Sequence, residues 1–432
     1  MCRIKIRIFL LAAVLSMPAL CFSQNSSLNT YSPYTIYGLG DLHNTATAAT
    51  SAMGGIGTAY WDPYTVNVAN PASHAAVNRN SFIFNFGLSG KQSYLKESGG
   101  GSTAHNTFNI DNIAVKFPLY KGIGFSVSMT PMSSVGYQIE KDETDPDIIT
   151  DIGLVKYFYT GEGGITQFKA GVGFKVFEKL SLGADLIYYL GTISREYGNT
   201  VTTVTSTSSY GSASVINREE ISKLLFDVGL QYDIIRNTRR FLTFGAIYQP
   251  KATLDNKLVK QFGMTTSSDS IYYEEFTNTV KVPDKFSMGI FYRTEKLGIG
   301  FDCTFQNWKN SMEMSSIDDV SLSKSNSYNV GFEYTPNRID IRRALNRWTY
   351  RAGFRYTDMY LVKNGHNTSE KAITFGVGIP LKMTSFSSVD VGVELGQRGT
   401  TRHQLIKHNY FKVSVGISLF GSDDWFVKRK YY

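Results

Sequence analysis

The sequence predicts an all-β protein: a transmembrane antiparallel β-barrel of about fourteen strands that encloses an N-terminal luminal hatch, or plug. Three observations predict this fold. The chain starts with an export signal, aromatic residues make up 14% of it, and long segments carry apolar residues at every second position. Because lipid offers no hydrogen bonds to a backbone, a sheet that crosses a bilayer must close on itself.

The first residues have the pattern of a secretory signal peptide, which we place at residues 1–23. Basic residues precede an apolar run over residues 8–20, and small residues follow it. The run is shorter than the ~20 residues of a transmembrane helix, which disfavours a membrane anchor. The mature chain is expected to begin near Gln24. Cys303 would then be its single cysteine, with no disulfide framework.

Residues 24–80 are predicted to form the hatch. This segment contains SAMGGIGTAYWDPYTVNVANPAS at residues 51–73, which is rich in glycine and small residues and has no clean helical or strand period. It holds too little apolar surface to fold as a separate domain. Such a segment is stable only when it packs on another folded part of the protein, and the inner surface of a barrel provides such a part.

Residues 81–420 carry the strand period. In KLSLGADLIYYLGTIS, Leu182 and Leu186 share one apolar face, whereas Ser181 and Asp185 share the opposite, polar face. A soluble β-sandwich also alternates, but its strands average ~5–6 residues. The segments here run to about ten residues or more and have aromatic residues at their ends, as transmembrane barrels do. We place strands near residues 81–90, 109–119, 122–137, 164–177, 179–197, 217–234, 239–251, 284–294, 296–309, 324–335, 347–361, 370–382, 387–398 and 408–420.

The connections between these strands differ in length. Tight turns at residues 120–122, 178–179 and 295–296 are expected on the periplasmic side, with long loops outside. An even number of strands puts both chain ends in the periplasm and leaves residues 421–432 as a periplasmic tail. The predicted long loops are residues 91–108, 138–163, 198–216, 252–283 and 310–323.

Glycine recurs on the inward face in the middle of the strands. Glycine weakens a strand unless a bend or a close neighbour needs the space. Two interpretations are open: curvature of the barrel, or room for a plug in a lumen too wide for strand side chains alone to fill. The positions are Gly183, Gly229, Gly245, Gly289, Gly300, Gly331, Gly353, Gly376, Gly392 and Gly416.

The segment AMGGIGTAYWDPYTVNVANPAS resembles the N-terminal hatch of the FadL-type family of outer-membrane hydrophobic-compound transporters, whose barrels have the same strand number. The hatch residues that carry this resemblance are Gly54, Gly55, Asn70, Pro71 and Ala72. Later stretches such as GEGGITQFKAGVGFKVFEKLSLGADLIYYLG and NRWTYRAGFRY are similar to the branch of such barrels in Bacteroidetes-type outer membranes. The hatch departs from the usual run into Asn-Pro-Ala-Gly, which leaves the ligand open.

The resemblance implies a barrel in the Gram-negative outer membrane that takes up hydrophobic or amphipathic small molecules passively. The hatch would gate the lumen, which Tyr189 and Phe291 would line. A lateral exit would lie at the third strand, where Pro131 and Gly136 interrupt the pattern. Proline cannot donate to a strand ladder, so it marks a break or an edge. An ordinary bulge at the barrel rim is an equal interpretation of Pro131.

A second functional class remains open. The barrel could handle proteins, like the FadL-fold member that shuttles cargo in the type IX secretion system, or could be a subunit of an outer-membrane assembly machine. Its loops or its tail would then bind other envelope proteins. The expected partners are therefore outer-membrane lipid and either a hydrophobic small molecule or envelope proteins.

Other classes of function are disfavoured. The formal net charge of +8 is spread along the chain, which argues against nucleic acid as a partner. The His residues are scattered without the H-x-x-x-H spacing of a metal site. No spacing proposes a Ser–His pair for nucleophilic catalysis. We therefore expect no enzyme activity, no cofactor and no metal.

Overall fold

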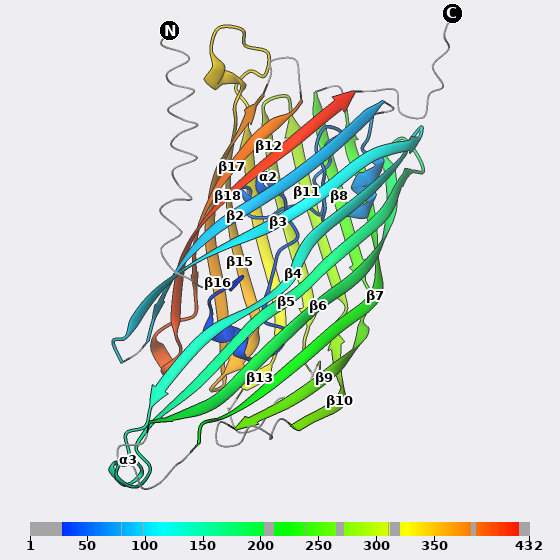
Figure 1. Cartoon of the computed structure of the whole chain (residues 1–432). Coiled ribbons are helices and arrows are strands. Elements are labelled where there is room, and N and C mark those ends of the chain that lie inside the picture. Colours follow the sequence, from blue (N-terminus) through cyan, green and yellow to red (C-terminus); the bar gives the residue numbers. More distant parts are fainter. Residues whose placement is uncertain are drawn as a thin grey trace, which may run out of the picture.

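The computed structural model describes residues 28–78, 80–97, 99–202, 211–237, 239–264, 272–309, 311, 320–381 and 386–422 (Figure 1). Within these ranges the strands form a closed, antiparallel 14-strand barrel, because the last strand pairs with the first. No helix in the described part of the chain is long and apolar enough to cross a membrane. The predicted signal peptide and residues 423–432 of the predicted tail lie outside the described residues.

An observed strand overlaps every predicted strand range, so the predicted strand positions are confirmed. The elements are η1 (Pro33–Ile36), β1 (Asp41–Leu42), α2 (Ala48–Ser51), η2 (Pro71–Ala75), β2 (Ser81–Lys96), β3 (Ser102–Tyr120), β4 (Ile123–Asp142), α3 (Pro146–Asp151), β5 (Leu154–Lys175), β6 (Leu180–Thr202), β7 (Ala213–Arg236), β8 (Arg240–Gln249), β9 (Ala252–Met264), β10 (Tyr272–Val282), β11 (Lys285–Thr294), β12 (Leu297–Asn307), β13 (Val320–Leu322), β14 (Lys324–Tyr334), η4 (Ala344–Arg347), β15 (Thr349–Lys363), β16 (His366–Pro380), β17 (Ser388–Arg398), η5 (Arg402–Gln404) and β18 (Lys407–Ser422).

The prediction of a long loop over residues 252–283 was wrong. Strands β9 and β10 pair with each other, β9 also pairs with β7, and the two lengthen the hairpin of β8 and β11. Lys257 Nζ bonds Glu275 Oε1 at 2.9 Å across this pair. The part of this pair that includes Lys257 and Glu275 has no apolar face, because both faces of a sheet meet water beyond the apolar belt. Strands likewise extend into the predicted loops 91–108, 138–163 and 198–216.

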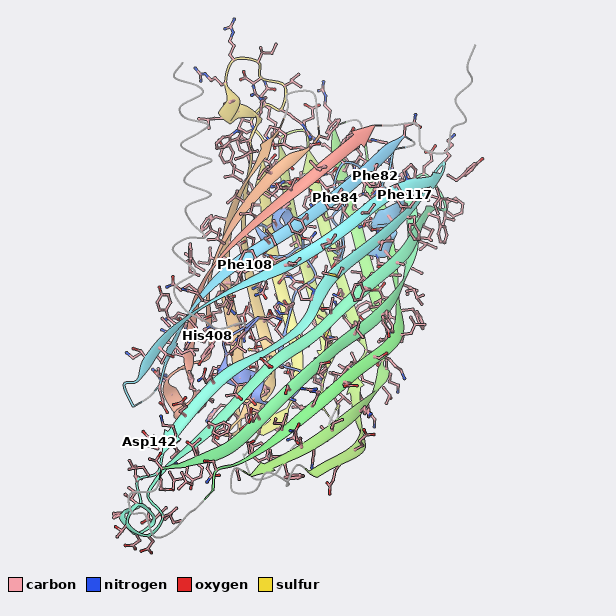
Figure 2. All side chains as sticks on the ribbon, viewed as in Figure 1. Phe82, Phe84, Phe108, Phe117, Asp142 and His408 are labelled. Carbon is pink, nitrogen blue, oxygen red and sulfur yellow. The ribbon has the colours of Figure 1, made fainter. Side chains whose placement is uncertain are left out.

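The outer face of the barrel wall is as predicted, and the inner face is polar only in part. In β6, Asp185 and Tyr189 are each 3% exposed and face the lumen, whereas Leu186 and Leu190 are about half exposed on the outside. Figure 2 shows side chains covering this outer surface, with Phe108 and the other labelled aromatic residues along β2 and β3. The outer face is therefore apolar, as a bilayer requires. The inner face carries polar residues such as Asp185, but it is apolar where Ile187 and Ile193 join a buried cluster.

Residues 28–78 lie inside the barrel, and we call them the luminal segment (Figure 1). In this segment η1 packs on β4, α2 packs on β16 to β18, and η2 packs on β4 to β7. Most of the predicted inward glycines make room for it, since an added Cβ would lie within 2.7 Å of its atoms. These glycines are Gly183, Gly229, Gly245, Gly300, Gly331, Gly353, Gly376 and Gly416, whereas Gly289 faces Asp302.

Candidate functional site: a lateral slit closed by the luminal segment

The ladder between β3 and β4 is incomplete. It runs from Tyr120 paired with Ile123 to Ile113 paired with Met129 and ends there. The rest of β3 pairs only with β2, and the rest of β4 pairs with β5. We call the space between residues 102–112 and 130–142 the lateral slit. Figure 1 shows β3 and β4 side by side at one end and spreading apart toward the other.

Pro131 lies just beyond the last pair of this ladder. On its other edge, β4 remains paired with β5, with a register shift between Pro131 and Ser133. The bulge expected from the proline is therefore present on one edge of β4. The ladder on the other edge of β4 ends two residues before Pro131.

The luminal segment pairs with the free edge of β4. Asp41 and Leu42, which form β1, lie opposite Ser134 and Ser133. Two further backbone bonds continue this pairing: Ser32 N donates to Gly136 O at 2.8 Å, and His43 N donates to Met132 O at 2.9 Å. An extended segment thus adds to an open sheet edge and satisfies its backbone groups.

Gly136 is the predicted site residue at which the contact is closest. A Cβ there would lie 1.9 Å from the carbonyl oxygen of Thr30 and 2.8 Å from its carbonyl carbon. Backbone atoms of a paired segment cannot move away from such a clash. Glycine at this position therefore lets the luminal segment reach β4.

Residues 29–31 span the slit from one strand to the other. The ring of Tyr31 stacks on His105 of β3 with centroids 3.3 Å apart, and its hydroxyl donates to Gln138 O of β4 at 3.0 Å. Asn109 of β3 donates from Nδ2 to Asn29 O at 2.7 Å. The luminal segment therefore occupies the place that β3 would have on an unbroken wall.

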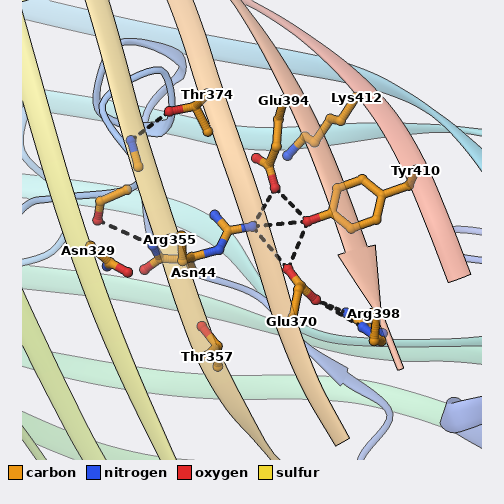
Figure 3. Close-up of polar contacts among 12 residues, drawn as sticks. Asn44, Asn329, Arg355, Thr357, Glu370, Thr374, Glu394, Arg398, Tyr410 and Lys412 are labelled. Carbon is orange, nitrogen blue, oxygen red and sulfur yellow. Dashed lines mark hydrogen bonds and ion pairs between the residues drawn. The ribbon is translucent and has the colours of Figure 1, made fainter. Parts of the chain in front are cut away.

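A polar chamber of about 220 Å³ lies behind this closure. Thr30, Asn109, Asp111 and Pro131 line it on the side of the slit. The opposite wall is formed by β15 to β18 and is charged (Figure 3). The lining of this chamber is therefore mostly polar and charged.

The far wall of the chamber is a connected network of charges. Arg355 bonds Glu370 at 3.1 Å and also Glu394, and the Tyr410 hydroxyl donates to these carboxylates at 2.8 and 2.7 Å (Figure 3). Arg398 bonds Glu370 Oε2 at 2.6 Å. Buried charges are tolerated when their partners are complete, and losing one partner is costly.

This network extends to the luminal segment. Arg398 on β17 also forms an ion pair with Asp41 of β1, and both side chains are nearly fully buried. Asp41 thus links the strand that covers the slit to the charged wall across the chamber. A displacement of β1 would leave Arg398 with a single carboxylate partner.

Strand residues hold the remainder of the luminal segment. Asp302 Oδ2 accepts from Gly57 N at 2.7 Å and Thr58 N at 2.8 Å. Asp185 Oδ1 bonds His74 Nε2 at 2.9 Å. Sequence reasoning placed Asp185 on the polar face but did not identify these contacts.

The predicted hatch residues form tight backbone contacts. Gly54 has φ of +70° and donates its N–H to Thr374 Oγ1 at 2.9 Å, and Gly55 follows with φ of +82°. Asn70 caps η2 by accepting from Ala72 N at 3.0 Å, and Pro71 is its first residue. These residues shape the segment, and none of them lines the chamber.

The two predicted lumen-lining aromatics lie in different places. Tyr189 is buried in an apolar cluster that strands on several sides of the lumen form with Leu39 of the luminal segment, and it accepts from Gln249 Nε2 at 3.1 Å. Phe291 packs edge to face on Tyr60 with centroids 5.1 Å apart. It also lines a second cavity of about 340 Å³ beside residues 60–65. Both face inward, but they do not share one binding site.

A closed barrel with residues 28–78 inside it and an interrupted ladder between two strands defines the class: a β-barrel with the FadL-type fold. The structure is similar to a Pseudomonas aeruginosa FadL homologue, with 13% identity, 89% of this chain and 99% of that chain covered, and a TM-score of 0.57. It is also similar to the Ralstonia pickettii toluene transporter TbuX, with 14% identity, 88% of this chain and 99% of that chain covered, and a TM-score of 0.54. A third similar structure is the Pseudomonas putida toluene transporter TodX, with 14% identity, 90% of this chain and 100% of that chain covered, and a TM-score of 0.55.

The chain itself belongs to the BamG family, whose model matches residues 4–432. No curated protein matches it. The predicted resemblance to FadL-type barrels is thus confirmed for the fold. The family is a different one, and identities this low to the solved structures carry the fold alone.

Proposed function

We propose that this barrel passes small amphipathic or apolar molecules between its lumen and the outer membrane through the lateral slit. The observation that carries this proposal is that the ladder between β3 and β4 ends where the polar chamber meets the wall. Withdrawal of residues 29–43 would join the chamber to the bilayer without breaking any pair between barrel strands. Residues 24–80 would then be the hatch that gates the barrel.

The chemistry at the slit favours amphipathic molecules. Inside, Lys412 Nζ lies 3.3 Å from Asp111 at the edge of the chamber. Outside, Phe108 and Ile110 of β3 are 58% and 45% exposed on the lipid-facing surface. A molecule with a polar head and an apolar body could keep its head in the chamber while its body enters lipid. The similar structures named as toluene transporters support uptake of apolar molecules.

The same proposal includes the location. The barrel fold supports the outer membrane of a Gram-negative cell, with the tight turns and both chain ends in the periplasm. Residues 1–23 would be removed on export. The origin in a Bacteroidetes-type membrane is inferred from sequence resemblance alone.

A reversible lock tests the proposal. Leu42 lies opposite Ser133, and directly paired strand residues are within disulfide range. Leu42→Cys/Ser133→Cys in a Cys303→Ala background should tie the luminal segment to β4. The matched control is Val320→Cys/Lys363→Cys, a cross-strand pair of β13 and β15.

Initial uptake of radiolabelled toluene and a radiolabelled long-chain fatty acid by cells expressing each variant gives the answer. Under oxidising conditions the lock should reduce uptake to the level of cells without the barrel, and a reductant should restore it. The control pair should transport in both states. Equal uptake by the oxidised and reduced lock would exclude passage through the slit.

A second candidate is the protein-handling barrel, either a secretion shuttle or an assembly subunit. The observation that favours it is an ordered loop with exposed apolar residues between β14 and β15, over residues 335–348. Under this proposal the lock would leave growth and envelope-protein binding unchanged. Loss of the loop surface would affect both.

A further inference from the structure

The loop over residues 335–348 is ordered by its own hydrogen bonds. Asp340 Oδ1 accepts from Arg342 N at 2.8 Å and Arg343 N at 2.9 Å, and Oδ2 accepts from Asn346 Nδ2 at 2.6 Å. Arg347 donates to Asp340 O at 2.7 Å. The bond from Arg343 N to the Asp340 carboxylate, followed by those from Asn346 Nδ2 and Arg342 N, holds the pKa of this carboxyl below its usual value. We call residues 335–348 the arginine loop.

The arginine loop exposes large apolar side chains. Ile339 and Ile341 are each 78% exposed, and Leu345 is 58% exposed. They belong to a connection at the end of the barrel, whereas most exposed apolar residues lie on strands, where lipid covers them. Figure 1 shows this connection, in gold, projecting beyond the barrel wall. Burial of such side chains is favourable, so exposed apolar groups gathered on an ordered backbone mark an interaction surface.

The charged side chains that the arginine loop exposes to solvent are positive. Arg342 and Arg343 are exposed, and the carboxylate of Asp340 is engaged by the loop itself. Arg338 is held at the base, where its guanidinium lies 4.4 Å from the ring centre of Phe386 and 5.9 Å from that of Tyr64 in the luminal segment. The free face therefore offers apolar residues bordered by two guanidinium groups.

We propose that the arginine loop docks an envelope protein that presents an apolar pocket with an acidic rim. Ile339, Ile341 and Leu345 would enter the pocket, and Arg342 and Arg343 would pair with carboxylates on its rim. The charge pattern selects this partner, because arginine forms geometrically specific pairs with carboxylates. The loop is ordered by internal bonds, so docking would cost little conformational entropy.

The proposal rests on the second candidate function, since it names the kind of partner that the same loop would bind, and it is independent of passage through the slit. The arginine loop joins β14 to β15 at the end with the tight turns, which is predicted to face the periplasm. The slit lies between β3 and β4, toward the opposite end. A failure of one proposal therefore leaves the other intact.

Site-specific photocrosslinking in native outer membranes tests the docking. Benzoylphenylalanine in place of Ile341 in the full chain should give one discrete adduct with a protein. The cross-linked peptide should contain several carboxylates beside apolar residues. The same probe in place of Thr150, an exposed residue of α3 at the other end of the barrel, should give no such adduct.

Charge variants make the test specific. Arg342→Glu/Arg343→Glu should abolish the adduct, whereas Arg342→Lys/Arg343→Lys should retain most of it. Both variants should keep the heat-dependent gel shift of a folded barrel, because the two side chains are exposed. The adduct should also persist in the oxidised Leu42→Cys/Ser133→Cys lock. An adduct with phospholipid, with a second copy of this chain or with a non-acidic peptide, an adduct that survives charge reversal, or no adduct would overturn the proposal.

Discussion

Asp302 of β12 shows how single inward-facing charges fix the luminal segment. The carboxylate accepts from two consecutive backbone N–H groups, of Gly57 and Thr58, and is 4% exposed. A hydrogen bond to a charged group contributes about 1.5–3 kcal/mol, and an unpaired buried donor costs a similar amount. The luminal segment therefore depends on a few carboxylates that project from the wall.

Replacing this carboxylate should loosen the luminal segment while the barrel stays closed. Asp302→Ala leaves two buried donors unpaired and should weaken the attachment of the segment by about 2–4 kcal/mol. Asp302→Asn keeps an acceptor oxygen and should have a smaller effect. Limited proteolysis in detergent should cut within residues 44–70 of the alanine variant first. Equal resistance of all three proteins would show that Asp302 does not hold the segment.

For single residues, the sequence predicts which face of a strand a side chain lies on better than it predicts which residue that side chain contacts. The alternation places Asp185 on the inner face, and its burial confirms this. Its bond to His74 could not be predicted, because the two residues meet only when the luminal segment docks. The stack of Tyr31 on His105 across the slit has no sequence signal for the same reason.

Elements of the barrel wall make room for the luminal segment through glycine. A Cβ on Gly183 of β6 would lie 2.4 Å from the carbonyl carbon of Pro71, whereas a Cβ on Gly90 of β2 would meet nothing closer than 4.0 Å. Gly183→Val should therefore push against backbone that is itself packed. Overpacking of this kind typically costs about 1–3 kcal/mol.

The two glycines form a matched pair for measurement. In urea titrations of the detergent-folded protein, Gly183→Val should lower the unfolding midpoint clearly. Gly90→Val should leave it close to that of the unaltered chain. A midpoint that responds equally to both variants would favour barrel curvature, not the plug, as the reason for inward glycines.

The alternation of apolar and polar residues predicts the position of a strand only where one face of that strand has to be apolar. The strands that cross the apolar belt were predicted, whereas β9 and β10 were not. These two strands carry charged pairs such as Lys257 with Glu275, so no continuous apolar face distinguishes them from a loop. Pro131 in the sequence indicated an irregular third strand. Only the pairing register of the structure shows that this strand, β4, separates from β3 and stays paired with β5.

The whole molecule is a barrel whose lumen the luminal segment fills. Its described cavities, of about 220 and 340 Å³, lie on different parts of this segment and have separate linings. The fold class could be predicted from the sequence, because composition and period reflect it directly. The polar chamber and the closure of the slit depend on how the plug docks.

A filled lumen should not conduct ions. In planar bilayers the unaltered protein should give no stable conductance steps. Deletion of residues 30–78 should give large, frequent openings, because barrels of this width leave space when empty. The heat-dependent gel shift checks that the deletion variant is folded. Steady conductance by the unaltered protein would contradict a closed lumen.

The most direct test of the central claim compares two cysteine pairs in outer membranes. The claim is that the luminal segment, and not β3, pairs with the free edge of β4. Leu42 lies opposite Ser133 in the structure, whereas continuing the ladder beyond Ile113 and Met129 would bring Asn109 opposite Ser133. In a Cys303→Ala background, Leu42→Cys/Ser133→Cys should form a disulfide in high yield, and Asn109→Cys/Ser133→Cys should not. The reverse result would mean that β3 and β4 form an unbroken wall, and the slit would not exist.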